Sequence, residues 1–284
     1  MATTTPSPFA REMRRRRTLR RMSQLELATG AGTTQRHVSF IESGRSVPGR
    51  AMVVRLAESL GLSLRERNSL LLSAGYAPAY AESAPDAEAV EPVMTALCSI
   101  LTGHLPYPAV AVGRHGNLVL ANDAFGLLTE GAAAHLLEPP VNVLRLALHP
   151  QGMAPRVANL AVWGRHITAN LRTRAAAHPD PELDSLIAEL TGYLPPEPPT
   201  GPDHVGFAAP LRLRTGDGEL RLLTTLTSFA TAVDVTLAEL HLEAFLPADA
   251  ATAALLHHRA GTRPPGARAT GPRTAASDQR PITG

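Results

Sequence analysis

The first quarter of the chain is a series of short helical patterns, most of which stop at glycine. Residues 9–22, FAREMRRRRTLRRM, contain neither Gly nor Pro and are dominated by good helix formers. Ser23 and Thr34 are placed to cap the next two helices. A fourth helix is expected at residues 50–60, and Ser63 opens a fifth with a capping-box pattern. The sequence therefore predicts an all-α domain of five helices.

The second and third of these helices have the spacing of a helix-turn-helix. Such a motif needs a small residue within its first helix, a glycine at the turn, and two apolar residues that fix the second helix in place. Ala28, Gly32, Val38 and Ile41 meet these needs. Helical bundles that bind nothing can show the same spacing. The whole pattern is therefore specific evidence for a helix-turn-helix, whereas any single residue of it is weak evidence.

The outward side of the third helix carries residues suited to reading DNA bases. With the apolar residues turned inward, Gln35, Arg36 and Ser39 fall together near the amino end, where a recognition helix meets base edges in the major groove. Arginine bonds guanine with two hydrogen bonds, and glutamine bonds adenine in the same way. We expect a second set to hold phosphates: Gln24, Thr34, Ser43, Arg45, Arg50, Arg15 and Arg16.

Charge divides sharply along the 284 residues, although the net charge is only +2. Residues 1–75 carry 13 arginines against five glutamates, whereas residues 76–260 carry ten arginines against 19 acidic residues. This asymmetry indicates a polyanion as the partner of the first domain. The arginine run at 14–17 is also what a solvated helix face looks like. Together with the helix-turn-helix pattern, the charge predicts binding to a double-stranded DNA operator.

Composition divides the chain into four parts. We place the helix-turn-helix domain at residues 9–76 and a linker, rich in Ala, Pro and acidic residues, at 77–92. A second domain follows at residues 93–259. The tail at 260–284 consists mainly of Gly, Pro, Thr, Ala and Arg, and we expect it to be disordered.

The second domain mixes strand and helix patterns. Helical spacing occupies residues 141–193. Alternating or apolar strand patterns lie at residues 110–112, 118–120, 205–213, 219–229 and 235–246. Because the helices fall between pairs of strands, the sequence predicts an α+β domain with a single sheet.

Both halves resemble known families. Residues 9–76, above all MSQLELATGAGTTQRHVSFIESGRSVPGRAMVVRLAESLGL, resemble the Cro-like helix-turn-helix of bacterial regulators, the xenobiotic response element type, with Thr33 where Val or Ile is usual. The second half, from PAVAVGRHGNLVLAND to DPELDSLIAELTGY, resembles the MmyB-like ligand-binding domain. This resemblance implies a PAS-like sensor that encloses a small apolar ligand, for which a fatty acid is the family precedent.

Several residues of the second domain are candidates for contact with such a ligand. The apolar candidates are Val112, Trp163, Phe207 and Leu223, and the polar ones are Asn122, Arg145, His149, Arg156, Asn159 and His166. Either Arg145 or Arg156 would pair with a ligand carboxylate. Apolar side chains of this kind are more often plain core, and buried polar ones more often satisfy backbone groups and helix ends.

Enzyme interpretations fail on the residues that they require. All 27 basic residues are arginine, so the chain lacks the lysine of a Walker loop or a Schiff-base mechanism. Gly30-Ala31-Gly32 follows a helix rather than a strand, unlike a dinucleotide fingerprint. His257 and His258 are adjacent and not four apart as in a helical metal pair. We therefore predict no enzyme, no metal and no cofactor.

The combined expectation is a bacterial transcription regulator. The single Cys98 indicates a reduced cytoplasmic compartment, and no apolar stretch is suited to a membrane span. We expect a homodimer in which a ligand alters the spacing or orientation of two reading helices. Two alternatives stay open: the second domain turns over its ligand as an enzyme, or it is an interaction module for another protein.

Overall fold

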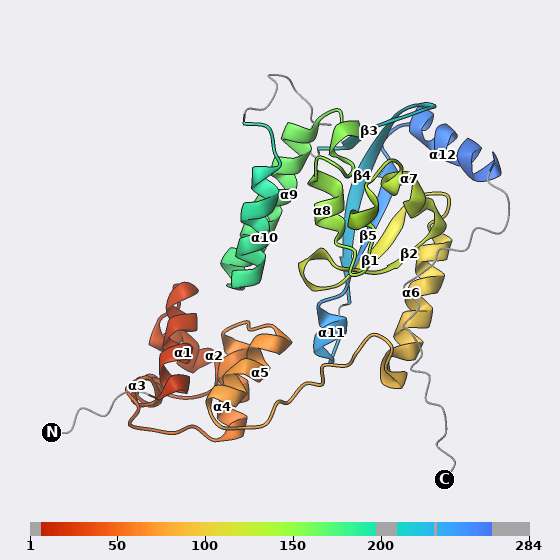
Figure 1. Cartoon of the computed structure of the whole chain (residues 1–284). Helices are drawn as coiled ribbons and strands as arrows, with labels where there is room; N and C mark the ends of the chain where they lie inside the picture. The colour runs from red at the N-terminus through yellow and green to blue at the C-terminus, as the bar shows by residue number, and fades with distance from the viewer. Residues whose placement is uncertain (1–6, 197–208, 230–231, 263–284) are drawn as a thin grey trace, which may run out of the picture. The chain divides into compact units, whose positions relative to one another are not determined.

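The computed structural model describes residues 7–196, 209–229 and 232–262 (Figure 1). The chain forms two compact units, which we call the helical unit and the sheet unit. The helical unit takes the described residues within Met1–Ala87, Thr173–Asp180 and Phe229–Glu239, and the sheet unit takes those within Glu88–Arg172, Pro181–Ser228 and Leu240–Gly284. Two short segments from the range expected for the second domain thus belong to the helical unit.

The helical unit contains the five helices that the sequence predicts. They are α1 (Pro8–Leu19), α2 (Gln24–Gly30), α3 (Gln35–Glu42), α4 (Arg50–Ser59) and α5 (Leu64–Ser73). Their apolar faces meet in one core, in which Met13, Leu27, Val38 and Ile41 are completely buried. Burial of each such side chain contributes about 1.5–3 kcal/mol, so this core holds the helices together.

Local hydrogen bonds set where three of these helices begin. Ser23 with Glu26, and Ser63 with Glu66, form capping boxes in which each side chain bonds the backbone N–H of the other residue. The hydroxyl of Thr34 caps α3. These caps are the ones expected from the sequence, because capping depends on residues within one turn of each other.

The strand expected over residues 235–246 is wrong at its beginning. Val235–Ala238 is a helical turn, α11, because the Asp234 carboxylate accepts hydrogen bonds from two N–H groups of this turn at 2.8 and 3.2 Å. The other carboxylate oxygen of Asp234 accepts from the N–H of Ser83 at 3.0 Å. The strand itself starts only at His241.

The sheet unit is built on five antiparallel strands in the order β2-β1-β5-β4-β3. They are β1 (Ala109–Val112), β2 (Leu118–Ala121), β3 (Leu211–Thr215), β4 (Gly218–Ser228) and β5 (His241–Pro247). All four residues of β1 are buried, and β1 pairs with β5, so the first strand meets the last. With its helices, this unit confirms the predicted α+β class.

Six helices accompany the strands in the described part of the chain. They are α6 (Glu91–Gly103), α7 (Gly126–Thr129), α8 (Val143–Leu148), α9 (Leu160–Ala177), α10 (Pro181–Gly192) and α12 (Ala250–Thr262). α6 packs on β1, and α12 packs on β4 and β5 (Figure 1). Helix α9 belongs to both units, since its last residues are part of the helical unit.

Three bounds differ from the sequence expectations. In the described residues β3 begins at Leu211, and residues 205–208, which include Phe207, lie outside them. α6 begins at Glu91, so the end of the expected linker is helical. α12 continues to Thr262, which places the first residues of the expected tail in a helix, and the rest of that tail lies outside the described residues.

Arg21 adopts a backbone conformation that favours glycine. It follows α1 with φ +54°, and its N–H bonds the carbonyl of Thr18 at 2.9 Å. The N–H of Met22 reaches back to the carbonyl of Arg17 at 3.1 Å. This arrangement is a Schellman helix end, whose left-handed residue is usually glycine because a side chain there crowds the following carbonyl oxygen.

Replacing Arg21 by glycine is expected to raise the free energy of unfolding by about 0.5–1 kcal/mol, because it relieves this crowding. Urea unfolding of the full chain measures the change. The control is Arg14→Gly, at an exposed position within α1, which should lower the free energy of unfolding by about 1 kcal/mol. An equal decrease in the free energy of unfolding for both variants would contradict the strain assigned to the left-handed backbone of Arg21.

Candidate nucleic-acid interface

Helix α3 presents the residues expected to read bases on its outer side. Gln35 and Arg36 are exposed and Ser39 is half-buried. Val38 and Ile41, on the opposite side of α3, are completely buried. The apolar side chains therefore turn the polar face of α3 away from the core, as the spacing predicts.

The turn between α2 and α3 is tight, and its unusual threonine is satisfied. Gly32 has φ +61°, which suits glycine. Thr33 stands where Val or Ile is usual, and its hydroxyl hydrogen-bonds with His37 Nδ1 at 2.9 Å. Gly30 lies close to α4, because a β-carbon there would lie 2.2 Å from Ser59 Oγ and 3.2 Å from Ser59 Cβ, so the Ser59 side chain would have to shift. The turn thus brings α2 close to α4.

One buried carboxylate orients α3 against its neighbours. Glu42, only 5% exposed, accepts hydrogen bonds from Arg17 Nε at 2.6 Å, Arg17 Nη2 at 3.0 Å and Gln24 Nε2 at 2.7 Å. A buried carboxylate is costly unless it is fully paired, so these bonds join α1, α2 and α3. Sequence reasoning missed Glu42, because its partners lie 18 and 25 residues away along the chain.

Some polar residues expected to hold phosphates already have partners within the protein. Gln24 is half-buried against Glu42, and the exposed Thr34 caps α3. Ser43 Oγ donates to the carbonyl of Phe40 at 3.2 Å and accepts from Arg45 Nε at 3.0 Å. These bonds fix the positions of the hydroxyls and of the amide around α3.

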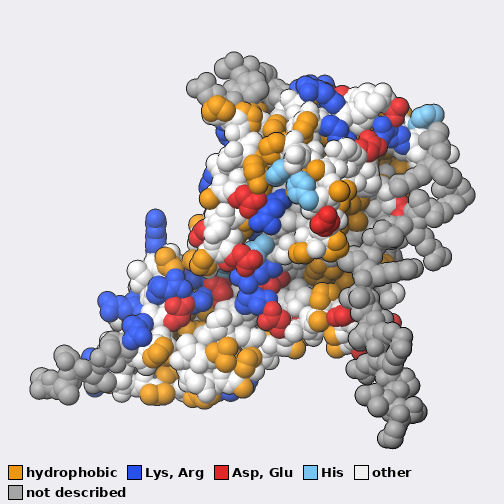
Figure 2. Space-filling model, viewed as in Figure 1, with side chains coloured by type: hydrophobic (Ala, Val, Ile, Leu, Met, Phe, Trp, Pro, Cys, Tyr) orange, Lys and Arg blue, Asp and Glu red, His pale blue; other side chains and the backbone are white. Residues whose placement is uncertain are grey.

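The arginines of the helical unit fall into two groups. Arg15 and Arg16 both bond Glu12, and Arg16, only 8% exposed, also bonds Glu66 at 2.5 Å. On the face drawn in Figure 2, blue arginine and red carboxylate side chains of this unit lie against each other. By contrast, no described carboxylate forms an ion pair with the exposed residues Arg36, Arg45 and Arg50.

Arg16 is therefore not available for a phosphate unless its ion pairs break. Its two ion pairs make Arg16 a less suitable phosphate contact than its place in the arginine run suggests. Arg15 also pairs with Glu12, but its side chain is 51% exposed, and an ion pair in contact with water exchanges its partner for a phosphate at little cost. The residue type and the position in an arginine run did not distinguish the two, since only the packing of α1 on α5 shows which of them faces inward.

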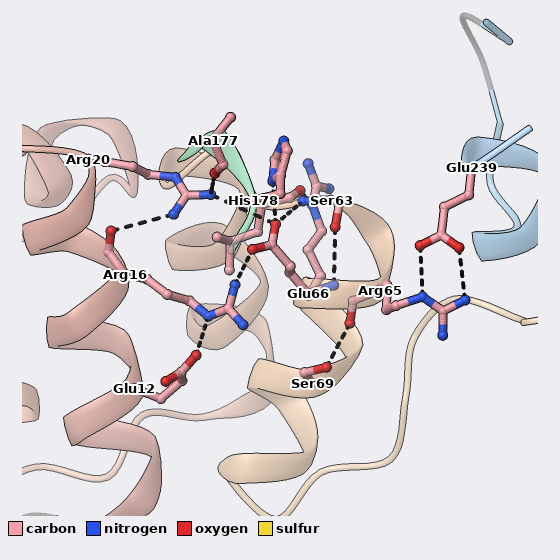
Figure 3. Close-up of polar contacts among 12 residues, drawn as sticks. Glu12, Arg16, Arg20, Ser63, Arg65, Glu66, Ser69, Ala177, His178 and Glu239 are labelled. Atoms are coloured by element: carbon pink, nitrogen blue, oxygen red, sulfur yellow. Dashed lines mark hydrogen bonds and ion pairs between the residues drawn. The ribbon is translucent and has the colours of Figure 1, made fainter. Parts of the chain in front are cut away.

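The carboxylate of Glu66 is the centre of a cluster of hydrogen bonds and ion pairs in the helical unit (Figure 3). Its carboxylate hydrogen-bonds with Arg16 Nη1 at 2.5 Å, with His178 Nδ1 at 2.8 Å and with the N–H of Ser63 at 2.9 Å. Burial of the carboxyl raises its pKa, but the hydrogen bonds from His178 and Ser63 and the charge of Arg16 outweigh burial and lower the pKa of Glu66 to about 2. His178 lies 112 residues further along the chain.

Arg20, just after α1, and Arg65 of α5 bind three further segments of the chain (Figure 3). Arg20 donates to the carbonyl of Ala177 at 3.4 Å. Arg65 of α5 forms two hydrogen bonds with the Glu239 carboxylate at 2.7 and 2.9 Å, and an ion pair with Glu82 at 2.5 Å. The range expected for the sensor domain thus supplies polar partners to the helix-turn-helix.

The buried asparagines expected to contact a ligand instead bind backbone. Asn122 accepts from the N–H of Ala109 at 3.1 Å and donates to two carbonyls at 2.9 and 3.0 Å. Asn159 donates to the carbonyl of Pro210 at 2.8 Å and accepts from the N–H of Arg212 at 3.1 Å. These amides hold the starts of β1 and β3, which makes them less suited to contact a ligand.

The remaining ligand candidates differ in exposure. Val112 and Trp163 are buried, and His166 is exposed. Arg145 pairs with Glu189 through two hydrogen bonds of 2.7 and 2.9 Å on the surface. The carboxylate partner of Arg145 makes it a less suitable ligand for an anion than the sequence suggests.

Arg156 is held differently. Its guanidinium donates to the carbonyls of Leu127 and Leu128 at 3.2 and 2.6 Å, and it lies 3.7 Å from Glu130. Burial lowers the pKa of Arg156, because a charged group is less stable away from water. Its buried Nε has no hydrogen-bond partner among the described residues.

The described residues contain neither a metal-binding cluster nor a membrane span. No group of three or more His, Cys, Asp or Glu side chains is placed to hold a metal ion there. None of the helices in that part of the chain is both long enough and apolar enough to cross a bilayer.

Comparison with protein-family models assigns both halves of the chain. Residues 13–67 match a helix-turn-helix model, and residues 93–258 match the MmyB-like transcription regulator ligand binding domain. The second match covers more than half of the chain. Both models describe parts of transcription regulators rather than enzymes. No curated protein was found to match the chain.

The Glu66 cluster predicts a pH-dependent stability. Because the pKa of Glu66 is lowered to about 2 from about 4.3 in an unfolded chain, its ionised form stabilises the fold above about pH 4.3, and this contribution is lost as the pH falls toward 2. Glu66→Gln keeps a capping side chain but removes the charge. It is expected to lower the free energy of unfolding at pH 7 by about 2 kcal/mol.

Urea unfolding at several pH values between 7 and 2.5 measures this effect. The difference between wild type and Glu66→Gln should narrow below about pH 4.3. Glu26→Gln is the matched control, because Glu26 occupies the same place in the other capping box but is exposed and bonds no arginine or histidine among the described residues. A wild-type advantage over Glu66→Gln that stays constant down to pH 2.5 would contradict the role of the ionised carboxylate.

Proposed function

The chain belongs to the MmyB-like transcription regulators, and we propose that it binds a specific DNA operator through α3 and senses a small apolar molecule through its sheet unit. The proposal of DNA binding rests on the contrast between the two sides of α3, one polar and one apolar. Its outer side exposes Gln35 and Arg36, while Val38 and Ile41 are buried behind them. We propose that it acts in the bacterial cytoplasm, where a regulator meets DNA.

We assign base reading to the first turns of α3. Arg36 has no carboxylate partner among the described residues, so its guanidinium is available for the two acceptors of a guanine. Gln35 matches the donor and acceptor of an adenine, and Ser39 reaches either kind of base. Thr34, Ser43, Arg45 and Arg50 surround this face and would hold phosphates, with Gln24 at the start of α2 and Arg15 on α1.

A variant pair separates base reading from charge. Arg36→Ala should reduce affinity for the preferred duplex about 10–100-fold and change affinity for a scrambled duplex little, because only base recognition is lost. Arg15→Ala should weaken both duplexes by a similar factor and reduce the slope of affinity against salt by about one. Selection from a random duplex library supplies the preferred sequence, and fluorescence anisotropy measures binding. Equal losses on both duplexes for Arg36→Ala would count against the assigned face.

We propose that the ligand is fatty-acid-like, as the family precedent suggests. Trp163 and Val112 are buried apolar side chains of the sheet unit that suit an acyl chain, and Phe207 stays a candidate outside the described residues. Arg156 is the better partner for a ligand carboxylate, because its buried Nε has no hydrogen-bond partner among the described residues and its ion pair with Glu130 is long, at 3.7 Å, whereas Arg145 makes two short hydrogen bonds to Glu189. Because His166 is exposed, it would contact the ligand only where the proposed binding site opens to solvent.

We propose that ligand binding changes DNA affinity through segments shared by the two units. Helix α9 carries Trp163, and its end belongs to the helical unit, where Ala177 and His178 contact Arg20 and Glu66. A ligand that shifts α9 would therefore alter contacts with α1 and α5. In a dimer, whose reading helices must lie about 34 Å apart, small changes of this kind alter affinity strongly.

Native mass spectrometry of freshly purified protein tests the ligand and the dimer together. We expect the mass of two chains with an apolar molecule on each. Removing that molecule should change affinity for the selected duplex at least about fivefold, within the usual range of allosteric coupling, and adding it back should restore it. A bound molecule converted to a product would indicate an enzyme. An empty protein that co-purifies with another protein would favour the interaction-module alternative.

A further inference from the structure

An aromatic side chain of α3 lies between Arg36, on the same helix, and Arg45, just after it, and neither arginine has a carboxylate partner among the described residues. Phe40 lies four residues after Arg36, on the same side of α3, and is half-buried. The guanidinium carbon of Arg36 is 5.2 Å from the centre of its ring, and that of Arg45 is 4.7 Å away. Both distances are within the range at which a ring face attracts a cation.

The backbone after α3 brings Arg45 to this ring. The carbonyl of Phe40 accepts from the N–H of Arg45 at 2.8 Å and from the N–H of Ser46 at 3.1 Å, so the chain folds back over the helix end. Gly44, with φ +76°, permits this reversal. Arg45 Nε then donates to Ser43 Oγ at 3.0 Å. Arg36 reaches the same ring from one helical turn earlier.

A ring and a carboxylate orient an arginine with different consequences. Arg16 and Arg17, which bond Glu66 and Glu42, are neutralised and must lose a partner before they can bind phosphate. Phe40 attracts Arg36 and Arg45 without neutralising either, so both charges stay available. Two like charges beside one ring also repel each other, and an anion placed between them relieves that repulsion.

We propose that Phe40 is a positioning residue for DNA recognition: it holds Arg36 toward a base and Arg45 toward the adjoining phosphate before the DNA arrives. This proposal rests on the DNA-binding function proposed above. Side chains that are ordered in the free protein lose less freedom on binding, so the ring increases affinity without itself touching a polar group of the DNA.

The test compares side chains of similar size at position 40 in the full chain. Phe40→Leu keeps an apolar side chain but removes the ring face, and it should weaken binding to the preferred duplex about five- to tenfold. Phe40→Tyr keeps the ring and should bind within about twofold of wild type. Pentafluorophenylalanine at position 40 keeps the shape but reverses the charge distribution of the ring, and it should behave like Phe40→Leu.

Thermal unfolding of each variant separates positioning from folding. The proposal stands if the pentafluoro variant unfolds at the wild-type temperature and still loses affinity. It is overturned if that variant and Phe40→Leu bind the preferred duplex like wild type. It is also overturned if the loss of affinity among the variants correlates with their loss of unfolding temperature and not with the loss of an electron-rich ring. Failure of Arg36→Ala to affect binding would instead overturn the proposed reading face, so the two failures are distinguishable.

Discussion

The helical unit depends on the requirement that a buried carboxylate be fully paired. Glu42 lies on the inner side of α3, and Arg17 of α1 and Gln24 of α2 saturate it. Removing Arg17 would leave a buried charge without its counter-ion, which costs about 3–5 kcal/mol, and removing Gln24 would take away one donor, which costs about 1–3 kcal/mol. The bonds of Glu42 therefore fix how α3 is turned about its axis, and that rotation decides which of its side chains face outward.

Among the described residues, the same requirement separates the arginines that form structural ion pairs from those that remain unpaired at the surface. Those near Glu42 and Glu66 are bound inside the protein and contribute to stability, while those on and just after α3 meet no described carboxylate. A net positive charge over this part of the sequence thus overstates the charge that DNA would meet. What matters for recognition is where the unpaired guanidiniums lie, and Arg36 and Arg45 lie together around Phe40.

Glu66 shows both the reach and the limit of sequence reasoning. Its place three residues after Ser63 predicts a capping box, and the box forms. Nothing in that spacing indicates that the same carboxylate would bond His178, or that Arg65 beside it would pair with Glu239. The strand expected from residue 235 fails for a related reason, because Asp234 caps a helical turn there and also bonds the N–H of Ser83.

The sequence by itself determined the five helices, the buried side of α3 and the α+β class of the second unit, because these follow from the spacing of residues within a turn or a strand. The tertiary structure decided that β1 pairs with β5, that Asn122 bonds backbone, and that Arg16 is bound inside while Arg36 is not. These outcomes depend on groups that come into contact only after the chain has folded. The energy of an ion pair or hydrogen bond is set by the distance between its groups and by their burial, and not by their positions in the sequence.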